Sequence, residues 1–211
     1  MVSVTNVMAV SLDGYIASYP GESDADRRRL GFTNEADRQY IRELVKQSDA
    51  VVVGAESMRV SRRSLADAND KGVVPTWIVP TRSGIDASLP WWQQTEVPKC
   101  IVAPDRAEIF VGENAERIGS DKDGVVATIM KYLERKQLTR IVLFGGAEIN
   151  RLFYAEGLVD LLKLTICPII LGQKEGVPLV VPNLPSAVHL DLITSHSEGN
   201  LVFLSYSVKR A

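Results

Sequence analysis

Three short segments combine glycine with hydroxyl or charged side chains at the end of an apolar run. They are 54–59 (GAESMR), 81–84 (TRSG) and 145–148 (GGAE). A glycine at a strand-to-helix turn lets backbone N–H groups approach a phosphate, and a nearby hydroxyl can donate a further hydrogen bond. An Arg between two hydroxyl residues suits a phosphate monoester, because a guanidinium can bind it bidentately. Together the segments predict a nucleotide crevice at the carboxyl ends of parallel strands.

The spacing of these glycines excludes two common nucleotide-binding classes. It does not match the dinucleotide pattern GxGxxG, and the chain has no GxxxxGK[ST] segment of the ATPase type. Taken singly, a glycine after a strand is more often part of a tight turn, and Thr-Arg-Ser-Gly is more often a solvated loop. The pair Gly145-Gly146 favours a functional role, since two adjacent glycines lose much backbone entropy on folding and a helix start requires neither.

Chemistry at such a crevice would also need a group that transfers protons. Asp13, in the turn Ser11-Leu12-Asp13-Gly14, is the first candidate, with Glu56 and Glu148 as alternatives. The alternative interpretation of the turn is a simple chain reversal. The basic clusters at 27–29 and 62–63 either bind a phosphate or form solvated surface.

The pattern of apolar residues predicts the elements that position these segments. Strands are expected at 2–10, 50–53, 76–79, 99–103, 140–144, 158–171, 187–195 and 200–208. Helices are expected at 33–48 with Thr33 as N-cap, and around 126–133 and 149–153. The polar stretch 18–31 predicts a loop, and 61–73 shows no periodicity. This order indicates an α/β fold with a mostly parallel twisted sheet, flanking helices and an antiparallel C-terminal hairpin, in one domain over residues 1–211.

Composition narrows the class of protein. The chain has 211 residues, with 24 Lys and Arg against 26 Asp and Glu, and this balance argues against a dedicated nucleic-acid binder. Two cysteines, Cys100 and Cys167, lie in apolar runs and are expected to be reduced and buried. With two histidines, a Cys/His zinc cluster is not expected. The absence of a signal peptide and of a membrane-length apolar run predicts a cytoplasmic protein.

Three parts of the chain carry a resemblance to a known family. Residues 8–17 (MAVSLDGYIA), 49–59 (DAVVVGAESMR) and 143–172 resemble the reductase domain of bacterial riboflavin biosynthesis, within the dihydrofolate-reductase-like superfamily. The resemblance runs in the same order from about Val4 to Gly172. It implies an NADPH-dependent reductase that transfers a hydride to a pyrimidine- or pterin-like heterocycle. A homodimer that acts on a small-molecule substrate is also implied. The charge balance and the lack of a membrane-length apolar run predict no nucleic-acid or membrane partner.

The resemblance further implies which residues form the site. Gly54 and Ser57 would lie at the cofactor pyrophosphate, and Thr81, Arg82 and Ser83 near the adenosine 2′-phosphate. The other side of the pyrophosphate and the nicotinamide would be lined by Gly145, Gly146, Ala147 and Glu148. The substrate would contact Ser11, Tyr15 and Thr33. Asp13, at the end of the first predicted strand, remains the candidate catalytic group, and no metal is expected.

Some residues depart from the family pattern on the substrate side. Tyr15 and Phe144 stand where the family usually has Lys and Glu, and residues 60–65 (VSRRSL) contain no Asp-Asn-Pro or Asp-Asp-Pro segment. These departures motivate an alternative hypothesis, a cofactor-binding but catalytically degenerate relative that acts as a sensor or accessory subunit. A third hypothesis, a binding module that uses the two Arg clusters, conflicts with the acidic charge balance.

Overall fold

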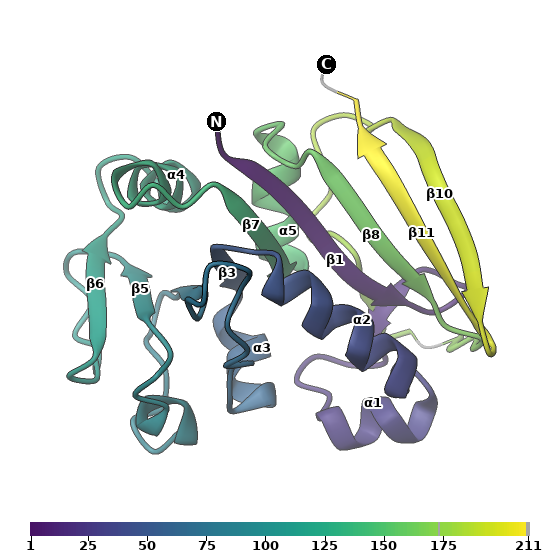
Figure 1. Cartoon of the computed structure of the whole chain (residues 1–211), viewed down its shortest axis with the longest axis horizontal. Coiled ribbons are helices and arrows are strands. Elements are labelled where there is room, and N and C mark those ends of the chain that lie inside the picture. Colours follow the sequence, from purple (N-terminus) through teal and green to yellow (C-terminus); the bar gives the residue numbers. More distant parts are fainter. Residues whose placement is uncertain (173, 210–211) are drawn as a thin grey trace. The chain divides into compact units, whose positions relative to one another are not determined.

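The computed structural model describes residues 1–172 and 174–209 (Figure 1). The chain divides into two compact units. The first unit contains Met1–Ser3 and Arg42–Val142, and the second contains Val4–Ile41 and Leu143–Ala211. The prediction of a single domain over 1–211 stays a prediction. Among the described residues, no helix has the length and apolar character needed to cross a membrane.

The first unit is built on parallel strands. Its strand order is β3 (Ala50–Val53), β4 (Thr76–Pro80), β5 (Lys99–Ala103) and β6 (Ala115–Gly119), and each neighbouring pair is parallel. The helical segments are α3 (Ala55–Ser61), the short 3₁₀ turn η1 (Pro90–Gln93) and α4 (Val125–Arg135). All four residues of β3 and all five of β5 are buried, which is typical of a parallel strand covered on both faces.

Side-chain packing in this unit follows the apolar patterns of the sequence. The predicted stripe on α4 is confirmed, because Val126, Ile129 and Leu133 are all buried. Trp91 is fully buried and its Nε1 donates a hydrogen bond of 2.7 Å to Ser64 Oγ. Trp91 therefore serves as a packing residue of this unit.

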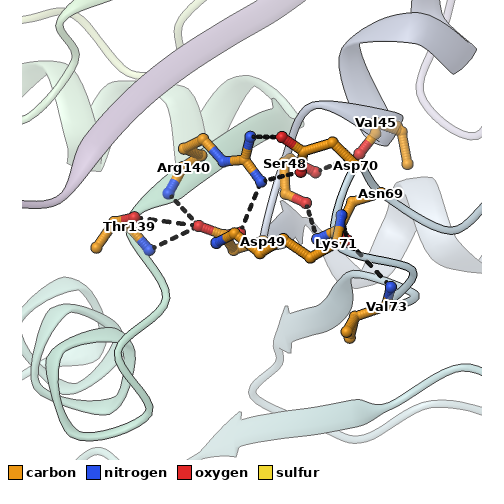
Figure 2. Close-up of polar contacts among 9 residues, drawn as sticks. All are labelled: Val45, Ser48, Asp49, Asn69, Asp70, Lys71, Val73, Thr139 and Arg140. Carbon is orange, nitrogen blue, oxygen red and sulfur yellow. Dashed lines mark hydrogen bonds and ion pairs between the residues drawn. The ribbon is translucent and has the colours of Figure 1, made fainter.

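A polar cluster lies where β3 and the strand β7 (Arg140–Gly145) begin (Figure 2). Asp49 immediately precedes β3 and its side chain is 5% exposed. It accepts hydrogen bonds from Thr139 and Arg140, and it forms ion pairs with Arg140 and Lys71. Asp70 binds the outer side of the same guanidinium. This cluster joins segments far apart in the sequence.

The second unit contains a mixed set of strands. Its strands are β1 (Ser3–Val10, from Val4 onward), β2 (Tyr15–Ala17), the end of β7, β8 (Leu161–Ile166), β9 (Val177–Pro178), β10 (Leu190–Glu198) and β11 (Leu201–Val208). β1 pairs with β8 in parallel, whereas β11 is antiparallel to both β8 and β10. The predicted α/β fold, with its mostly parallel sheet and C-terminal hairpin, is confirmed.

Helices of the second unit include α1 (Asp24–Leu30), most of α2 (Glu35–Lys46) and α5 (Ala147–Ala155). The first turns of α2 pack on the strands through Ala36 and Tyr40, which contact a buried cluster that includes Phe32 and Phe203. The rings of Tyr40 and Phe203 meet edge to face with centroids 5.1 Å apart. The amphipathic pattern predicted for this helix thus marks its buried face.

Helix α1 lies where a loop was predicted, so that prediction is wrong. Ser23 caps the helix by accepting a 3.1 Å hydrogen bond from Asp26 N, and Gly31 ends it with a φ of 86°. No residue of α1 is buried, so the helix has no apolar stripe for a pattern to detect. The predicted N-cap of α2 is also wrong, because Asn34 Oδ1, one residue after Thr33, accepts from Asp37 N at 3.0 Å.

Several strands differ from the predictions. β10 covers Leu190–Glu198 rather than 187–195, and the short strands β2 and β9 were not predicted. The apolar run 158–171 forms a strand only over Leu161–Ile166, because Gly157 and Leu158 still close the end of α5 and Pro168 lacks a backbone donor. Strand β6 was not predicted. Its sequence AERIG is polar and partly exposed, as expected at the end of a strand order.

Both cysteines are free and buried, as the sequence predicts. Burial raises the pKa of the Cys100 and Cys167 thiols to about 12. Neither thiol therefore supplies a thiolate at neutral pH.

Candidate functional site

The predicted site residues fall into two groups, one in each unit. In the first unit, Gly54 and Ser57 follow β3, and residues 81–83 follow β4. β3 and β4 are parallel neighbours, with Val52 opposite Ile78, so their carboxyl ends lie side by side. The structure therefore brings these five predicted residues to one edge of the first unit.

The loop after β4 is held in shape by hydrogen bonds to a single carbonyl group. Gly84 O accepts from Thr81 Oγ1 at 3.1 Å and from Arg59 Nη2 at 2.8 Å. Thr81 is buried, whereas Arg82 and Ser83 are exposed. Thr81 thus shapes the loop, while the Arg82 and Ser83 side chains reach the surface where an anion could bind. Arg59, which clamps the loop, was not predicted from the sequence.

Gly54 forms the N-cap of α3 and has a φ of −65°. Any residue adopts this backbone angle, so conformation does not require glycine here. The glycine instead leaves the buried turn between β3 and α3 without a side chain. Ser57 lies half-buried in the first turn of the helix.

In the second unit, the turn after β1 is closed by Ser11. This buried residue exchanges backbone and side-chain hydrogen bonds with Tyr15, among them Tyr15 N to Ser11 Oγ at 3.0 Å. The Tyr15 ring lies against the backbone of Gly176, where an added Cβ would come within 2.5 Å of ring atom Cδ1. Tyr15 is therefore held half-buried at the position where the family usually has Lys.

Asp13 lies exposed at the tip of this turn. Its two carboxylate oxygens accept hydrogen bonds from Leu171 N at 3.1 Å and Gly172 N at 2.8 Å. Hydrogen bonds from the Ser11 side chain and from the Gly172 and Leu171 backbones lower the pKa of Asp13 to about 2. The carboxylate is ionised at neutral pH and ties the turn to the segment after β8.

The predicted glycine pair follows β7. Gly145 has a φ of +64°, and a Cβ placed there would lie 1.8 Å from Asn150 Oδ1. Gly146 has a φ of +100° and precedes α5. Ala147 is buried in one cluster with Val10 and Ile16, so the structure brings the glycine loop and the turn after β1 together. Glu148, the last predicted residue of this loop, is exposed on α5.

A buried amide network fixes this loop and was missed at the level of sequence. Asn6 Nδ2 donates to Leu143 O at 2.9 Å and to Asn150 Oδ1 at 3.1 Å, and Tyr154 OH donates to Asn6 Oδ1 at 3.1 Å. Asn150 Nδ2 in turn donates to Leu179 O at 2.9 Å. The only sequence signal is a polar Asn within the apolar run of β1.

Thr33, the last predicted substrate residue, lies half-buried just before α2. Near it, Asp37 is 1% exposed and its Oδ1 accepts a 2.9 Å hydrogen bond from Thr165 Oγ1 of β8. Burial raises the pKa of Asp37, although the hydroxyl groups of Thr165 and Thr33 act in the opposite direction. The sequence pattern explains Asp37 only as an acidic residue in the first turn of a helix.

Comparison with known proteins places this arrangement in context. Residues 2–204 match the RibD C-terminal domain family. The chain is 26% identical over 216 residues to the 2,5-diamino-6-ribosylamino-4(3H)-pyrimidinone 5′-phosphate reductase of Aquifex aeolicus, covering 96% of this chain and 94% of that protein. The protein of the same name from Methanothermobacter thermautotrophicus is 25% identical, with 95% of each chain covered.

Solved structures share the fold. The structure of a pyrimidine reductase-like protein from Corynebacterium diphtheriae superposes with a TM-score of 0.80 at 19% sequence identity, covering all of this chain and 93% of that one. The RibD protein of Acinetobacter baumannii superposes with a TM-score of 0.79 at 20% identity, and the match covers 59% of that longer chain. The resemblance noted in the sequence is thereby confirmed at the level of fold and family.

Proposed function

Because the chain belongs to the RibD C-terminal domain family, we propose that it is an NADPH-dependent reductase of a ribosylamino-pyrimidine 5′-phosphate or a closely similar heterocycle. The observation that carries the proposal is the family match over residues 2–204. It is supported by two relatives named as pyrimidine reductases, each of which aligns over at least 94% of its length. Membership of this family makes the chain an oxidoreductase.

The predicted cofactor residues have features that suit NADPH. Arg82 and Ser83 are exposed on a loop clamped by Arg59, and a guanidinium beside a hydroxyl matches a 2′-phosphate. Gly145 and Gly146 have no side chain to keep a pyrophosphate away from the backbone. When bound, NADPH supplies the hydride.

The remaining chemistry falls to residues of this chain. A ribosylamino group opens to a C=N bond, and its reduction needs one hydride on carbon and one proton on nitrogen. Ser11, Tyr15 and Thr33 are the proposed substrate contacts. We assign Asp13 to holding the turn after β1 rather than to proton donation, because both its oxygens already accept backbone N–H groups.

A degenerate relative that binds the cofactor without catalysis is the second candidate. Tyr15 favours it, since the ring packed on Gly176 occupies the position of the family Lys. Phe144 also favours this candidate, because it stands where the family usually has Glu. This candidate predicts cofactor binding without turnover.

One pair of measurements tests both candidates. Thermal denaturation is followed with NADPH and with NADH, and NADPH oxidation is then followed with 2,5-diamino-6-ribosylamino-4(3H)-pyrimidinone 5′-phosphate. We expect stabilisation by NADPH in preference to NADH, and turnover. Stabilisation without turnover favours the degenerate relative, and no stabilisation by either nucleotide contradicts both.

We also propose a homodimer. β10 ends the strand order, all nine of its residues are exposed, and Leu192 and Ile193 are 56% and 53% exposed. An edge strand that exposes apolar side chains is a site for self-association. Light scattering of the purified protein should give twice the 23.2 kDa chain mass; a monomer at micromolar concentration contradicts this assignment.

A further inference from the structure

The loop after β4 is held from outside by one side chain of α3. The carbonyl oxygen of Gly84 accepts a 2.8 Å hydrogen bond from Arg59 Nη2, although the two residues lie 25 positions apart in the sequence. The same oxygen accepts a 3.1 Å hydrogen bond from Thr81 Oγ1, within the loop itself. Thr81 and Gly84 are buried, whereas Arg82 and Ser83 between them are exposed. The exposed pair therefore lies on a loop whose two ends are fixed.

The hydrogen bond from Arg59 does more than satisfy a buried acceptor. Thr81 already gives the Gly84 carbonyl a donor, so loss of the Arg59 side chain would not leave this oxygen unsatisfied. The Arg59 side chain is 36% exposed and its ion-pair partner Glu56 is 64% exposed, so the pair contributes little to the stability of the fold. What the bond from Arg59 adds is a fixed position for the carbonyl group.

The geometry of Arg59 makes that position well defined. Its Nη1 donates to Glu56 Oε2 at 2.9 Å, while its Nη2 donates to Gly84 O at 2.8 Å. A guanidinium is planar and rigid, so bonds from both of its Nη atoms fix its orientation. Glu56 lies three positions earlier on the same helix. The guanidinium is thus anchored to α3 and ties the loop to that helix.

A second part of the chain lies close to the same glycine. A Cβ added at Gly84 would come within 3.0 Å of Ile109 Cγ2 and 3.1 Å of Ile109 Cβ. Ile109 belongs to the segment between β5 and β6. Gly84 also has a φ of +82°, a backbone angle that favours glycine. The end of the loop is therefore held by both α3 and this segment, and it has little freedom to move.

We propose that Arg59 is a positioning residue that sets the preference of this protein for NADPH over NADH. The inference rests on the proposed function, in which Arg82 and Ser83 contact the 2′-phosphate. That phosphate is the group by which the two nucleotides differ. A loop that already has its binding conformation loses less conformational freedom when the phosphate binds. Release of the loop should therefore weaken the binding of NADPH and leave the binding of NADH nearly unchanged.

Nucleotide binding by two matched variants tests this inference. Arg59→Met removes the donors but keeps an unbranched apolar side chain. We expect the Kd for NADPH to rise about 10-fold, the scale of one hydrogen bond, and the Kd for NADH to stay within about twofold of the wild type. Arg135→Met is the control, because it also removes an ion-paired Arg. That side chain is 61% exposed and binds Glu116 near the start of β6, at the opposite end of the parallel strands. The control should keep the wild-type ratio of the two Kd values.

Hydrogen exchange separates positioning of the loop from a simple effect of charge. In the protein without nucleotide, amide exchange over residues 82–84 should become faster in Arg59→Met and stay unchanged in Arg135→Met. A loss of NADPH binding with unchanged exchange would mean that Arg59 acts through its charge, and it overturns the inference. An unchanged Kd ratio also overturns it. So does an equal loss for both nucleotides, which is the result expected of general destabilisation.

A further variant and the wild type itself complete the test. If Arg59→Met does not fold, Arg59→Lys decides, because its single ammonium keeps the charge but not the planar geometry with two Nη donors. It should show the same NADPH-selective loss and the same faster exchange, and wild-type values of both overturn the inference. Wild-type protein that binds neither nucleotide contradicts the proposed function and, with it, the inference. A wild-type preference for NADPH that persists in the Arg59 variants contradicts the inference alone.

Discussion

Replacing Asp49 by Asn should strongly destabilise the first unit. Oδ2 of Asp49 accepts from Thr139 N, Thr139 Oγ1 and Arg140 N at 3.0–3.1 Å, and Oδ1 accepts from Arg140 Nη2 and Lys71 Nζ at 3.0 Å (Figure 2). An Asn amide can replace only one of these oxygens. Its NH₂ group would then face the two cationic donors.

The magnitude follows from burial and from the partners that remain. Removing one member of a buried ion pair costs about 3–5 kcal/mol. The lower end applies here, because the Arg140 side chain is 35% exposed and keeps Asp70 as a partner at 2.7 Å. We therefore expect a loss of about 3 kcal/mol in the free energy of unfolding at pH 7.

The assay is urea unfolding of the wild type and of Asp49→Asn, with Asp70→Asn as the matched control. Asp70 binds the same guanidinium but its side chain is 60% exposed, so its replacement should cost less than about 1 kcal/mol. Equal losses in the two variants, or a loss below about 1 kcal/mol in Asp49→Asn, would refute the reasoning from burial.

The difference in unfolding free energy between the wild type and Asp49→Asn depends on pH in a defined direction. Burial acts to raise the pKa of Asp49, but hydrogen bonds from Arg140 and Lys71 overcome it and hold that pKa well below its usual range. Because the folded pKa lies below the unfolded value of about 3.9, the stabilisation is fully present above about pH 4 and is lost as the pH falls further. The difference between wild type and Asp49→Asn should narrow over that acidic range.

Three further predictions concern the site. Gly145→Ala should lower the free energy of unfolding in urea more than Gly157→Ala does. Both positions have nearly the same positive φ, but only at Gly145 would the added Cβ collide with an atom, Asn150 Oδ1. Equal losses would show that this contact relaxes freely. Ser83→Asp should reduce the thermal stabilisation by NADPH relative to NADH, through repulsion of a 2′-phosphate, and an unchanged ratio would place the phosphate elsewhere. Asp13→Asn should leave the shape of the kcat profile above pH 5 unchanged, since the pKa of Asp13 is about 2, while hydrogen exchange at the amides it binds becomes faster; a lost alkaline limb would make Asp13 the acid.

Local patterns in the sequence determined most of the elements. The runs AVVV and KCIVA are apolar at every or nearly every position, and a short buried strand is the conformation that covers such a run on both faces. The spacing of Val126, Ile129 and Leu133 fixed the buried face of α4 for the same kind of reason. Helix α1 was not predicted, because its ends are defined by capping residues and it has no stripe of buried apolar residues.

The candidate site was partly predictable because some chemistry is tied to the ends of strands. Gly145, Gly146 and the segment 81–83 follow apolar runs that form strands, so their neighbourhood could be inferred from the order of elements. The different roles of the neighbouring hydroxyl groups could not be inferred from the order of elements. Thr81 holds its own loop, while Ser83 is exposed.

Only the tertiary structure decided what the carboxylates do. Asp13, Asp37 and Asp49 all occur beside polar or helical sequence signals, and nothing local distinguishes them. Asp13 is bonded by backbone N–H groups that lie 158 and 159 positions away, Asp37 by a hydroxyl 128 positions away, and Asp49 by donors 90 and 91 positions away. The charge state of a carboxyl depends on its burial and on its donors. For these three residues, both are supplied by parts of the chain that only folding brings near.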